Sequence, residues 1–534
     1  MTFQLRYRPI PGLPRLAWAA AADPRSGDVD VAHGWAVECR DDWLVEGVWD
    51  GDFTAGKFNA SDHLFGSGLR IEEDRLYFVA STGLCDRLLW TEYGGRLHVS
   101  NSLPLLLATT GARLDPRHDY RLETFAIRQG AGDYPDTFVV DHPEIRAFHQ
   151  LYDGCLALDP SGRTERVTGR RAKRFRSYAE YRTLVRDALR CLRTNYASEA
   201  RRTPIEAFVT VSSGYDSVAA AALVAELGAT AAFSCRRSNS HLPAWLAPGA
   251  AIDDGSAIAG ALGLPLLTPD AAGAAPADER YFLAAGCMPP TLALRPLASF
   301  LGRRRSAAVV FTGFGGDDVW DTEAEREWHE RGVVRGDPAG LGLSEIRLQS
   351  GFSNVSVPTL CSRHIADLDA VAADQEMDPW RLLNAYDRPI PRRIAETAGV
   401  ARTAFGQRKK AVVAAYHYPV TRRLRPSFVA YIRRTRGVGL AFLRLHVGLN
   451  RLAYPFVRAW HLIARALLGG DRVLSPRTPH AFLWPQYDFA HALFLWAAES
   501  LSTELTATVR LGAVPPLPPA SATADVTRPA VVSC

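Results

Sequence analysis

Residues 209–223 read VTVSSGYDSVAAAAL, and three local signals follow one another within them. The β-branched start favours a strand, and the alanine-rich end favours a helix. Between them lies a turn of small residues that carries three serines and Asp216. Backbone N–H groups in such a turn form an anion site together with the positive end of the following helix. The stretch therefore predicts a strand, a phosphate-binding turn with free N–H groups and a helix, with Asp216 placed to hold the metal of the phosphates.

A second stretch of this kind is AAVVFTGFGGDDVW at residues 307–320. Its first five residues are apolar throughout, as in a parallel strand buried on both faces. Three glycines and two acids follow the strand directly. Carboxyl ends of parallel strands border the ligand crevice of open α/β sheets, where acids can hold a metal on phosphates. With a helical pattern at 178–200 and a further apolar strand at 231–235, these stretches predict an α/β fold with a doubly wound parallel sheet.

Both stretches resemble signature segments of the asparagine synthetase family. The first is similar to the Ser-Gly-Gly-x-Asp-Ser loop of ATP pyrophosphatases, and the second is similar to the family's Ser-Gly-x-Gly-Ala-Asp-Glu-Leu-Phe segment. The resemblance implies an enzyme that binds ATP and Mg²⁺ and forms AMP and pyrophosphate, with Asp216 and Asp317 as the metal ligands. The ATP-binding residues that it implies are Ser212, Ser213, Gly214, Asp216, Ser217, Gly313 and Gly315.

The third segment is AFGQRKKA at residues 404–411. Taken alone, a basic triplet is typical of a solvated surface. In its position after the other two stretches, it resembles the Arg-x-Lys segment near the end of the synthetase domain in asparagine synthetases and β-lactam synthetases. The resemblance implies that Lys410 is catalytic and stabilises the charge that develops as the acyl-adenylate reacts, with Lys409 as the alternative.

The first 170 residues are rich in strand patterns, including 75–80 and 96–100, with a Gly-Gly turn at 94–95. Residues 95–102, GRLHVSNS, resemble part of the glutaminase domain of class II amidotransferases. That domain uses an N-terminal cysteine nucleophile, and Thr2 stands here instead. Its substrate-binding loop is also missing from the sequence. The resemblance therefore implies a degenerate N-terminal-nucleophile-hydrolase-like domain without glutaminase activity, so that the amine must come from another substrate or from the same molecule.

Two departures from the family pattern bear on the site. Ser213 adds a Cβ where a positive φ is expected, at a cost of about 1 kcal/mol. Phe314 stands where the related enzymes have Glu or Tyr, and its side chain cannot accept or donate a proton. The base that deprotonates the amine must then be another group. Asp253 or Asp254 is expected to cap the helix that begins near Gly255.

The composition is that of an ordinary globular protein, with 534 residues, 47% hydrophobic and 22% charged. The eight cysteines show no metal-binding or disulfide-framework spacing, which favours a reducing, cytoplasmic compartment. Residues 13–22 are too short and interrupted for a signal peptide, and the sequence contains no apolar run of the roughly 18 residues that a membrane span needs. No nucleic-acid partner is indicated.

One further region is unusual in its charge. Between Glu396 and Asp471 the chain has no acidic residue and fourteen Arg and Lys residues. Arginines recur every seven residues from Arg444 to Arg465 among apolar residues, which predicts a basic amphipathic helix that Pro455 divides in two. Packing into the core, with the arginines reaching to water, is the favoured interpretation. Contact of residues 420–470 with an anionic membrane, a carrier or an acidic peptide is the alternative.

The sequence thus suggests a degenerate glutaminase-like domain at 1–170, an asparagine synthetase-like ATP-pyrophosphatase domain with a helical C-terminal region at 171–511, and a disordered tail at 512–534. The expected function is AMP-forming amide ligation, in which a carboxylate is adenylated and joined to an amine. The resemblance is closest in kind to β-lactam synthetases and lasso-peptide macrolactam cyclases. Two alternatives stay open, an ammonia-using asparagine synthetase and a non-catalytic nucleotide-binding scaffold. Ser213 and Phe314 favour the scaffold.

Overall fold

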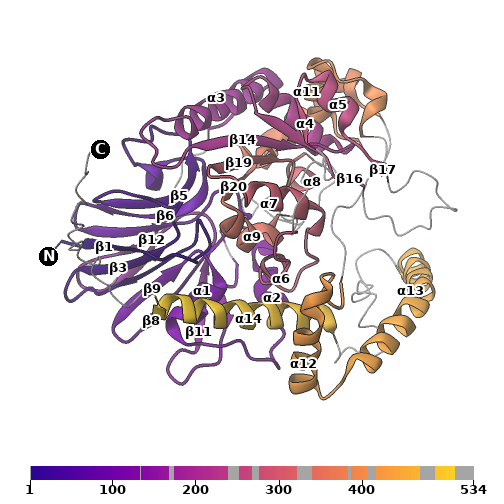
Figure 1. Ribbon diagram of the computed structural model, residues 1–534. Helices are drawn as coiled ribbons and strands as arrows, with labels where there is room; N and C mark the ends of the chain where they lie inside the picture. The colour runs from indigo at the N-terminus through magenta and orange to yellow at the C-terminus, as the bar shows by residue number, and fades with distance from the viewer. Residues whose placement is uncertain are drawn as a thin grey trace, which may run out of the picture.

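The protein is an α/β structure in which a β-rich N-terminal part adjoins a parallel sheet surrounded by helices (Figure 1). The computed structural model describes residues 2–132, 134–167, 173–237, 252–267, 276–320, 340–382, 387–406, 416–468 and 488–511.

Two sheets form the N-terminal part. The seven-stranded sheet has the order β1-β3-β2-β9-β8-β11-β10, and the six-stranded sheet has the order β13-β12-β7-β6-β5-β4. Their strands are β1 (Gln4–Pro9), β2 (Trp18–Ala22), β3 (Asp28–His33), β4 (Glu38–Cys39), β5 (Trp43–Trp49), β6 (Leu64–Glu72), β7 (Arg75–Val79), β8 (Leu88–Tyr93), β9 (Arg96–Ser100), β10 (Thr137–Val139), β11 (Ala147–Leu151), β12 (Cys155–Leu158) and β13 (Thr164–Val167).

The two sheets pack face to face through one apolar cluster. Trp18 and Val99 from the first sheet meet Leu69 and Phe78 from the second within it. The strands predicted at 75–80 and 96–100 are confirmed as β7 and β9. Gly94 and Gly95 both have positive φ, as the predicted tight turn between β8 and β9 requires.

The third sheet has five parallel strands in the order β18-β15-β14-β19-β20. They are β14 (Ile205–Thr210), β15 (Ala231–Phe233), β18 (Leu266–Leu267), β19 (Ala307–Thr312) and β20 (Phe352–Ser356), and a separate two-stranded ribbon consists of β16 (Arg236–Arg237) and β17 (Ile252–Asp253). The chain thus fills the sheet outward from β14 in one direction and then resumes at β19 on its other side. The order of the strands reverses between β14 and β19.

Both faces of this sheet are covered. The helices are α1 (Leu103–Thr110), α2 (Arg121–Thr124), α3 (Tyr178–Tyr196), α4 (Tyr215–Ala225), α5 (Ser256–Ala261), α6 (Arg280–Leu283), α7 (Arg295–Leu301), α8 (Gly316–Val319), α9 (Ser344–Ser350), α10 (Ile365–Ala373), α11 (Pro389–Thr397), α12 (Arg425–Arg436), α13 (Leu440–Leu468) and α14 (Phe489–Leu511). In β14, Val209 packs in one cluster with α3, α4 and α11, whereas Phe208 packs in another with α6, α7 and α14. Alternating residues of the strand therefore face two helical layers.

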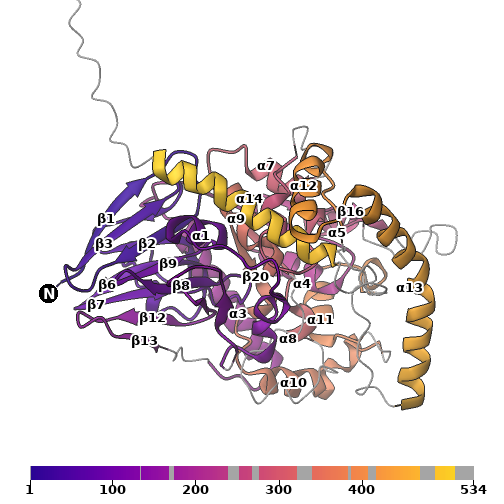
Figure 2. The same ribbon diagram turned by 90° about the horizontal axis from the view of Figure 1, so that it is seen from below.

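The C-terminal helix joins the two parts of the molecule. Leu505 of α14 packs with Leu105 of α1 in one cluster, and α14 runs past α1 toward the seven-stranded sheet (Figure 2). None of the helices in the described ranges combines the length and hydrophobicity that crossing a bilayer demands.

The structure corrects two local predictions. Pro455 lies inside α13, so the region forms one helix of 29 residues instead of two shorter ones. The N-cap of α5 is Gly255, although Asp254 Oδ1 accepts a hydrogen bond from the backbone N–H of Ser256. Asp253 caps nothing in α5 and bonds to another segment. The predicted tail at 512–534 lies outside the described residues.

Candidate nucleotide site

The first two predicted loops lie side by side because the strands that precede them are neighbours. β14 and β19 pair in parallel, with Val209 opposite Phe311. Residues 211–214 leave the carboxyl end of β14 and lead into α4, and residues 313–315 leave the carboxyl end of β19 and lead into α8. This is the point at which the strand order reverses. Open α/β sheets bind ligands at such a point, outside the carboxyl ends of the strands.

Two glycines allow the loops to touch. A Cβ on Gly316 would lie 2.3 Å from Oδ1 of Asp216, and a Cβ on Gly313 would lie 2.5 Å from the backbone carbonyl carbon of Asp216. Both distances are shorter than any real contact, so only glycine fits at these two positions. Gly315, which has φ 78°, makes the turn into α8. Asp317 follows Gly316 directly, so the two predicted metal ligands lie on loops that contact each other.

The loop after β14 is held by its own hydrogen bonds, and this changes one prediction. The N–H of Ser212 donates to Oγ of Ser217 at 3.1 Å, and the N–H of Gly214 donates to Oγ of Ser212 at 3.3 Å. The N–H and the hydroxyl of Ser213 both donate to Oδ1 of Asp253, at 2.8 and 2.7 Å. The expectation that these three N–H groups are free is therefore wrong in this conformation, because side-chain oxygens occupy them.

Ser213 also does not carry the expected backbone strain. Within the described residues, the positive-φ positions other than glycine are Glu73, Leu84, Asp153 and Cys361. Ser213 is not one of them, so its Cβ causes no left-handed strain. At the next position Gly214 is the N-cap of α4, with no side chain to cover the first turn of the helix.

The start of the third segment contacts the first loop directly. The N–H of Gly406 donates to the carbonyl of Ser213 at 2.8 Å. The guanidinium of Arg392 is fully buried and lies against the rings of Tyr215 and Phe405, 5.8 and 5.1 Å from their centroids. Residues 405–406 are thus fastened to the turn that follows β14. Lys409 and Lys410 lie outside the described residues, so their side chains are not placed.

Phe314 has a packing role in the second loop. A Cβ added to Gly340 would lie 3.3 Å from the ring of Phe314 and 2.9 Å from Sγ of Cys85, so the Phe314 ring packs closely against Gly340. Its carbonyl accepts a hydrogen bond from the hydroxyl of Ser356. The aromatic side chain therefore belongs to the apolar surroundings of the loop, as expected of a residue that cannot transfer protons.

The residues at the two loops have suitable chemistry for Mg²⁺. Within the described ranges, no cluster of three or more His, Cys, Asp or Glu side chains could by itself enclose a metal ion. Mg²⁺ does not need such a cluster, because it retains water and typically takes one or two carboxylates together with substrate phosphates. Asp216 and Asp317, both partly exposed on adjoining loops, match that requirement.

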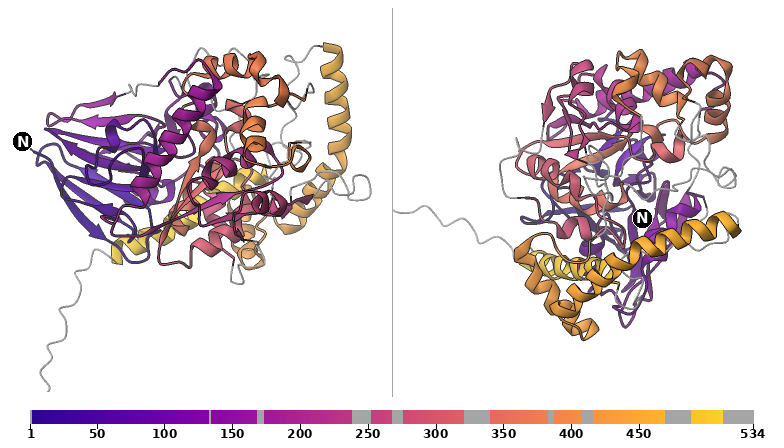
Figure 3. Two further views of the ribbon diagram at one scale, coloured as in Figure 1. Left: turned by 90° about the horizontal axis from the view of Figure 1, so that it is seen from above. Right: turned by 90° about the vertical axis from the view of Figure 1, so that its right-hand side faces the viewer.

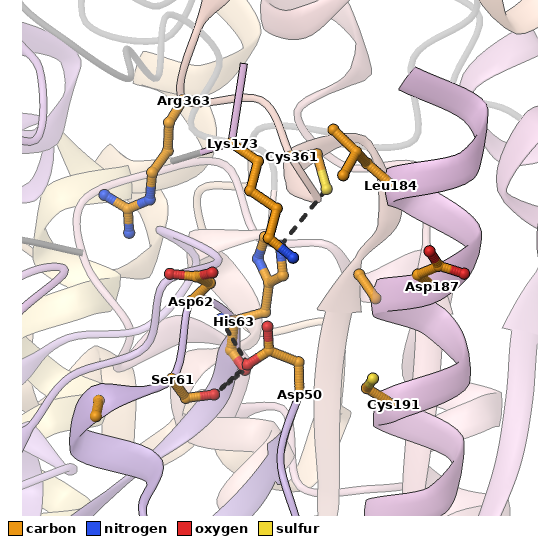
Figure 4. A pocket seen from close by; sticks show the side chains of 12 residues that line it. Asp50, Ser61, Asp62, His63, Lys173, Leu184, Asp187, Cys191, Cys361 and Arg363 are labelled. Carbon is orange, nitrogen blue, oxygen red and sulfur yellow. Dashed lines mark hydrogen bonds between the residues drawn. The ribbon is translucent and has the colours of Figure 1, made fainter. Parts of the chain in front are cut away.

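A separate cavity of about 280 Å³ lies between the N-terminal sheets and α3 (Figure 4). Its polar lining carries both signs of charge, from Asp50, Asp62, Lys173, Asp187 and Arg363. Sγ of Cys361 lies 3.7 Å from Nε2 of His63 there. Burial raises the pKa of the Cys361 thiol to about 12, so it stays protonated at neutral pH and provides no thiolate nucleophile.

Sequence reasoning placed the two acid-bearing loops together but missed three of their supports. The sequence predicts Asp253 or Asp254 as a helix cap, and it marks neither Arg392 nor Gly406 as a support of the loops. The signal for Gly406 is the glycine itself, which adopts a positive φ without steric cost, and its φ is 65°. The bonds between Ser213 and Asp253 and the packing of Arg392 on Tyr215 have no local signal, because they join residues that are distant in the sequence.

Comparison with known proteins adds no assignment to these observations. No model of a protein family matches the chain, and no curated protein shows significant similarity to it.

Proposed function

We propose that the protein is an ATP-dependent, AMP-forming amide ligase of the asparagine synthetase type that lacks glutaminase activity. In this proposal residues 171–511 form an ATP-pyrophosphatase domain, and residues 1–170 form a degenerate glutaminase-like domain. ATP and a carboxylate are the first substrates, and an amine is the second.

One observation supports this proposal most strongly. Two loops that carry Asp216 and Asp317 contact each other where the strand order reverses, and the close approach requires glycine at 313 and 316. A surface pair of acids that served only solubility would need no such close approach. The third segment adds a further contact, since Gly406 bonds to the same loop that holds Ser213.

The proposed roles follow from position. The turn at 212–217 and the first turn of α4 would receive the phosphates of ATP. Asp216 and Asp317 would hold Mg²⁺, which neutralises phosphate charge when bound. The substrate carboxylate attacks the α-phosphorus and pyrophosphate leaves. The amine then attacks the acyl carbon and AMP leaves, while Lys410 stabilises the negative charge of the transition state.

The N-terminal sheets would serve as a structural partner of the ligase part. Thr2 is exposed, just before the edge strand β1, so the residue at the position of the family nucleophile is not enclosed by the two sheets (Figure 1). Incubation with glutamine is expected to release no glutamate above background. Rapid glutamine hydrolysis that Thr2→Ala abolishes would contradict this part of the proposal.

The competing function is a nucleotide-binding scaffold without catalysis. It is favoured by Ser213 and Phe314, the two departures from the family pattern. For either function, the bonds from Ser213 to Asp253 place a carboxylate at an N–H that a phosphate would use. In the ligase proposal, the N–H of Ser213 leaves Asp253 and donates to a phosphate when ATP binds. Asp253→Asn should therefore bind Mg·ATP at least as tightly as the unaltered protein. A loss of ATP binding in Asp253→Asn would favour another ligand for this loop.

The direct test is exchange of labelled pyrophosphate into ATP across a set of carboxylic acids, each with and without amines. We expect exchange with a subset of acids and none in Asp216→Ala. The matched control is Asp254→Asn, an exposed acid beside the site, which should retain exchange. ADP as the product, or unchanged exchange in Asp216→Ala, would refute the proposal.

A second experiment separates ligation from scaffolding. Lys410→Ala should keep the ATP affinity within a few-fold and reduce product formation by roughly 10²-fold or more. If Lys409→Ala has that effect instead, the assignment moves by one residue. Normal turnover in both variants would remove the catalytic role of this segment, and binding of ATP without any turnover in the unaltered protein would favour the scaffold. An enzyme that uses only free ammonia as the amine would be an asparagine synthetase of the ammonia-dependent kind.

A further inference from the structure

Helix α13 exposes a continuous apolar stripe. Leu452, Phe456 and Trp460 are 72%, 78% and 71% exposed, and Leu445 and Ile463 are more than half exposed. Residues at these spacings lie on one side of an α-helix. From Leu445 to Ile463 the stripe is about 27 Å long, at 1.5 Å per residue.

Among the side chains of α13 that the structure describes, the buried ones belong to the first part of the helix. Leu443 and Val447 are buried in the cluster that includes Phe428 of α12 and Phe489 of α14. The rest of the helix runs along the outer edge of the molecule, away from the parallel sheet (Figures 2 and 3). The core-packing interpretation therefore holds for the helix up to Asn450, which is fully buried, and does not explain the stripe.

The charged residues of the segment that carries the stripe are all basic. No acidic residue occurs between Glu396 and Asp471. Arg444 is exposed on α13, and Arg422, Arg423 and Arg433 are exposed on or just before α12. By sequence position, the arginines at 444, 451, 458 and 465 stay on one flank of the helix, roughly 100–160° around the axis from the stripe. A cationic flank beside exposed Leu, Phe and Trp is the pattern of a helix that lies in the interface of an anionic membrane.

We propose that α13 binds anionic lipid surfaces, with its apolar stripe inserted between the headgroups and its arginines against the lipid phosphates. The helix stands at the edge of the molecule, and the stripe side chains are exposed (Figures 2 and 3). None of the described helices is suited to span a bilayer, which fits a helix that lies in the plane of the surface. The proposal is independent of the ligase activity, since it involves no residue of the nucleotide site.

The test is flotation of the full-length protein, without ATP, with vesicles of neutral phosphatidylcholine and with vesicles that contain 30% phosphatidylglycerol. We expect at least about tenfold stronger binding to the anionic vesicles, and a steep loss of binding at high salt. Arg444→Gln should weaken that binding about fivefold, as expected for one arginine near the surface.

A double variant, Leu452→Asp with Phe456→Asp, should lose anionic-vesicle binding by more than tenfold. The matched control is Leu122→Asp on α2, where a leucine that is 77% exposed undergoes the same change on another surface. It should bind vesicles normally. Thermal unfolding checks that all variants remain folded.

Three results would overturn the proposal. These are equal binding to neutral and anionic vesicles, unchanged binding of the double variant, and capture by polyglutamate that is stronger than capture by anionic vesicles. The last result would assign the helix to an acidic protein partner.

Discussion

The N–H of Gly406 donates to the carbonyl of Ser213 at 2.8 Å, and this bond joins two segments that are almost two hundred residues apart in the chain. It places the start of the basic segment at the loop after β14. Arg392 stabilises this contact. Its guanidinium packs on the ring of Tyr215 and donates a hydrogen bond to the carbonyl of Gly406 at 3.3 Å. The described part of this segment ends there, and Lys409 and Lys410 follow it in the sequence.

The first prediction concerns Gly406. Its φ is 65°, and a Cβ there would lie 2.5 Å from the ring of Tyr215 and 2.8 Å from Nη2 of Arg392. Gly406→Ala should therefore displace the basic segment and reduce pyrophosphate exchange by roughly tenfold or more, beyond the strain of about 1 kcal/mol that a positive φ imposes. Gly399→Ala is the matched control, since its φ is 90° and nothing lies within 4 Å of the added Cβ. Equal exchange rates in the two variants would show that the contact between Gly406 and Ser213 does not affect pyrophosphate exchange.

The second prediction concerns Gly316, where an added Cβ meets the carboxylate of Asp216 at 2.3 Å. Gly316→Ala must push Asp216 out of position, so we expect Mg·ATP affinity to fall by about tenfold or more, measured by titration calorimetry. Gly260→Ala in α5 serves as the comparison, because its Cβ would enter open space. That variant should bind normally and unfold at an equal or higher temperature, since alanine favours a helix. Normal Mg·ATP binding by Gly316→Ala would separate Asp216 from metal binding.

The sequence predicted the parts of the fold that have strong local patterns. Strands β14 and β19, helix α3 and the Gly94-Gly95 turn all follow from apolar runs, alanine content or paired glycines. The closeness of the loops after β14 and β19 was expected only from the resemblance to asparagine synthetases. What the sequence could not show is how distant polar groups choose partners. Asp253 has the local signature of a helix cap, yet its Oδ1 accepts two hydrogen bonds from Ser213.

The error at Pro455 has a similar cause. Proline removes one backbone hydrogen bond and disturbs the preceding turn, which predicted a break. The helix continues through it, with Pro455 itself exposed. A local rule thus gave the wrong number of helices, while the sign and spacing of the charges on the same segment were readable from the sequence alone.

The third prediction concerns Arg347, the side chain that ties α9 to the N-terminal sheets. It is 1% exposed, and its guanidinium bonds to Glu46 at 2.6 and 2.9 Å and to Asp86 at 2.6 Å. Arg347→Ala would leave two buried carboxylates without their cation, at a cost of about 3–5 kcal/mol in the free energy of unfolding. Urea denaturation measures this change.

Arg190→Ala is the control for loss of an arginine. Its ion pair with Asp187, at 3.6 Å, is exposed on α3, so its removal should change the free energy of unfolding by less than about 0.5 kcal/mol. If Arg347→Ala is no more destabilising than Arg190→Ala, the buried network does not hold the N-terminal sheets to the rest of the protein.

The last prediction concerns Glu345 of α9. Its side chain is buried against the beginning of α1. Its carboxylate accepts hydrogen bonds from the hydroxyl of Ser102 at 2.7 Å and from the N–H of Leu103 at 2.8 Å. Burial nevertheless raises its pKa from 4.5 to about 7. The folded protein therefore holds this proton more tightly than the unfolded chain does. The stabilisation is fully present below about pH 4.5 and is lost as the pH rises through about 7, with an upper limit of roughly 3 kcal/mol.

Glu345→Gln isolates this effect, because an amide keeps an oxygen to accept from Leu103 and an N–H to donate to Ser102 while it cannot ionise. Comparison of the unaltered protein with Glu345→Gln at pH 5 and pH 8 should show that the unaltered protein loses more stability over this interval. The difference in the free energy of unfolding between the two proteins should therefore shift in favour of the variant by about 1–3 kcal/mol at pH 8. An equal pH dependence in both proteins would mean that Glu345 stays ionised in the fold, with its two donors and the N-terminus of α1 compensating for its burial.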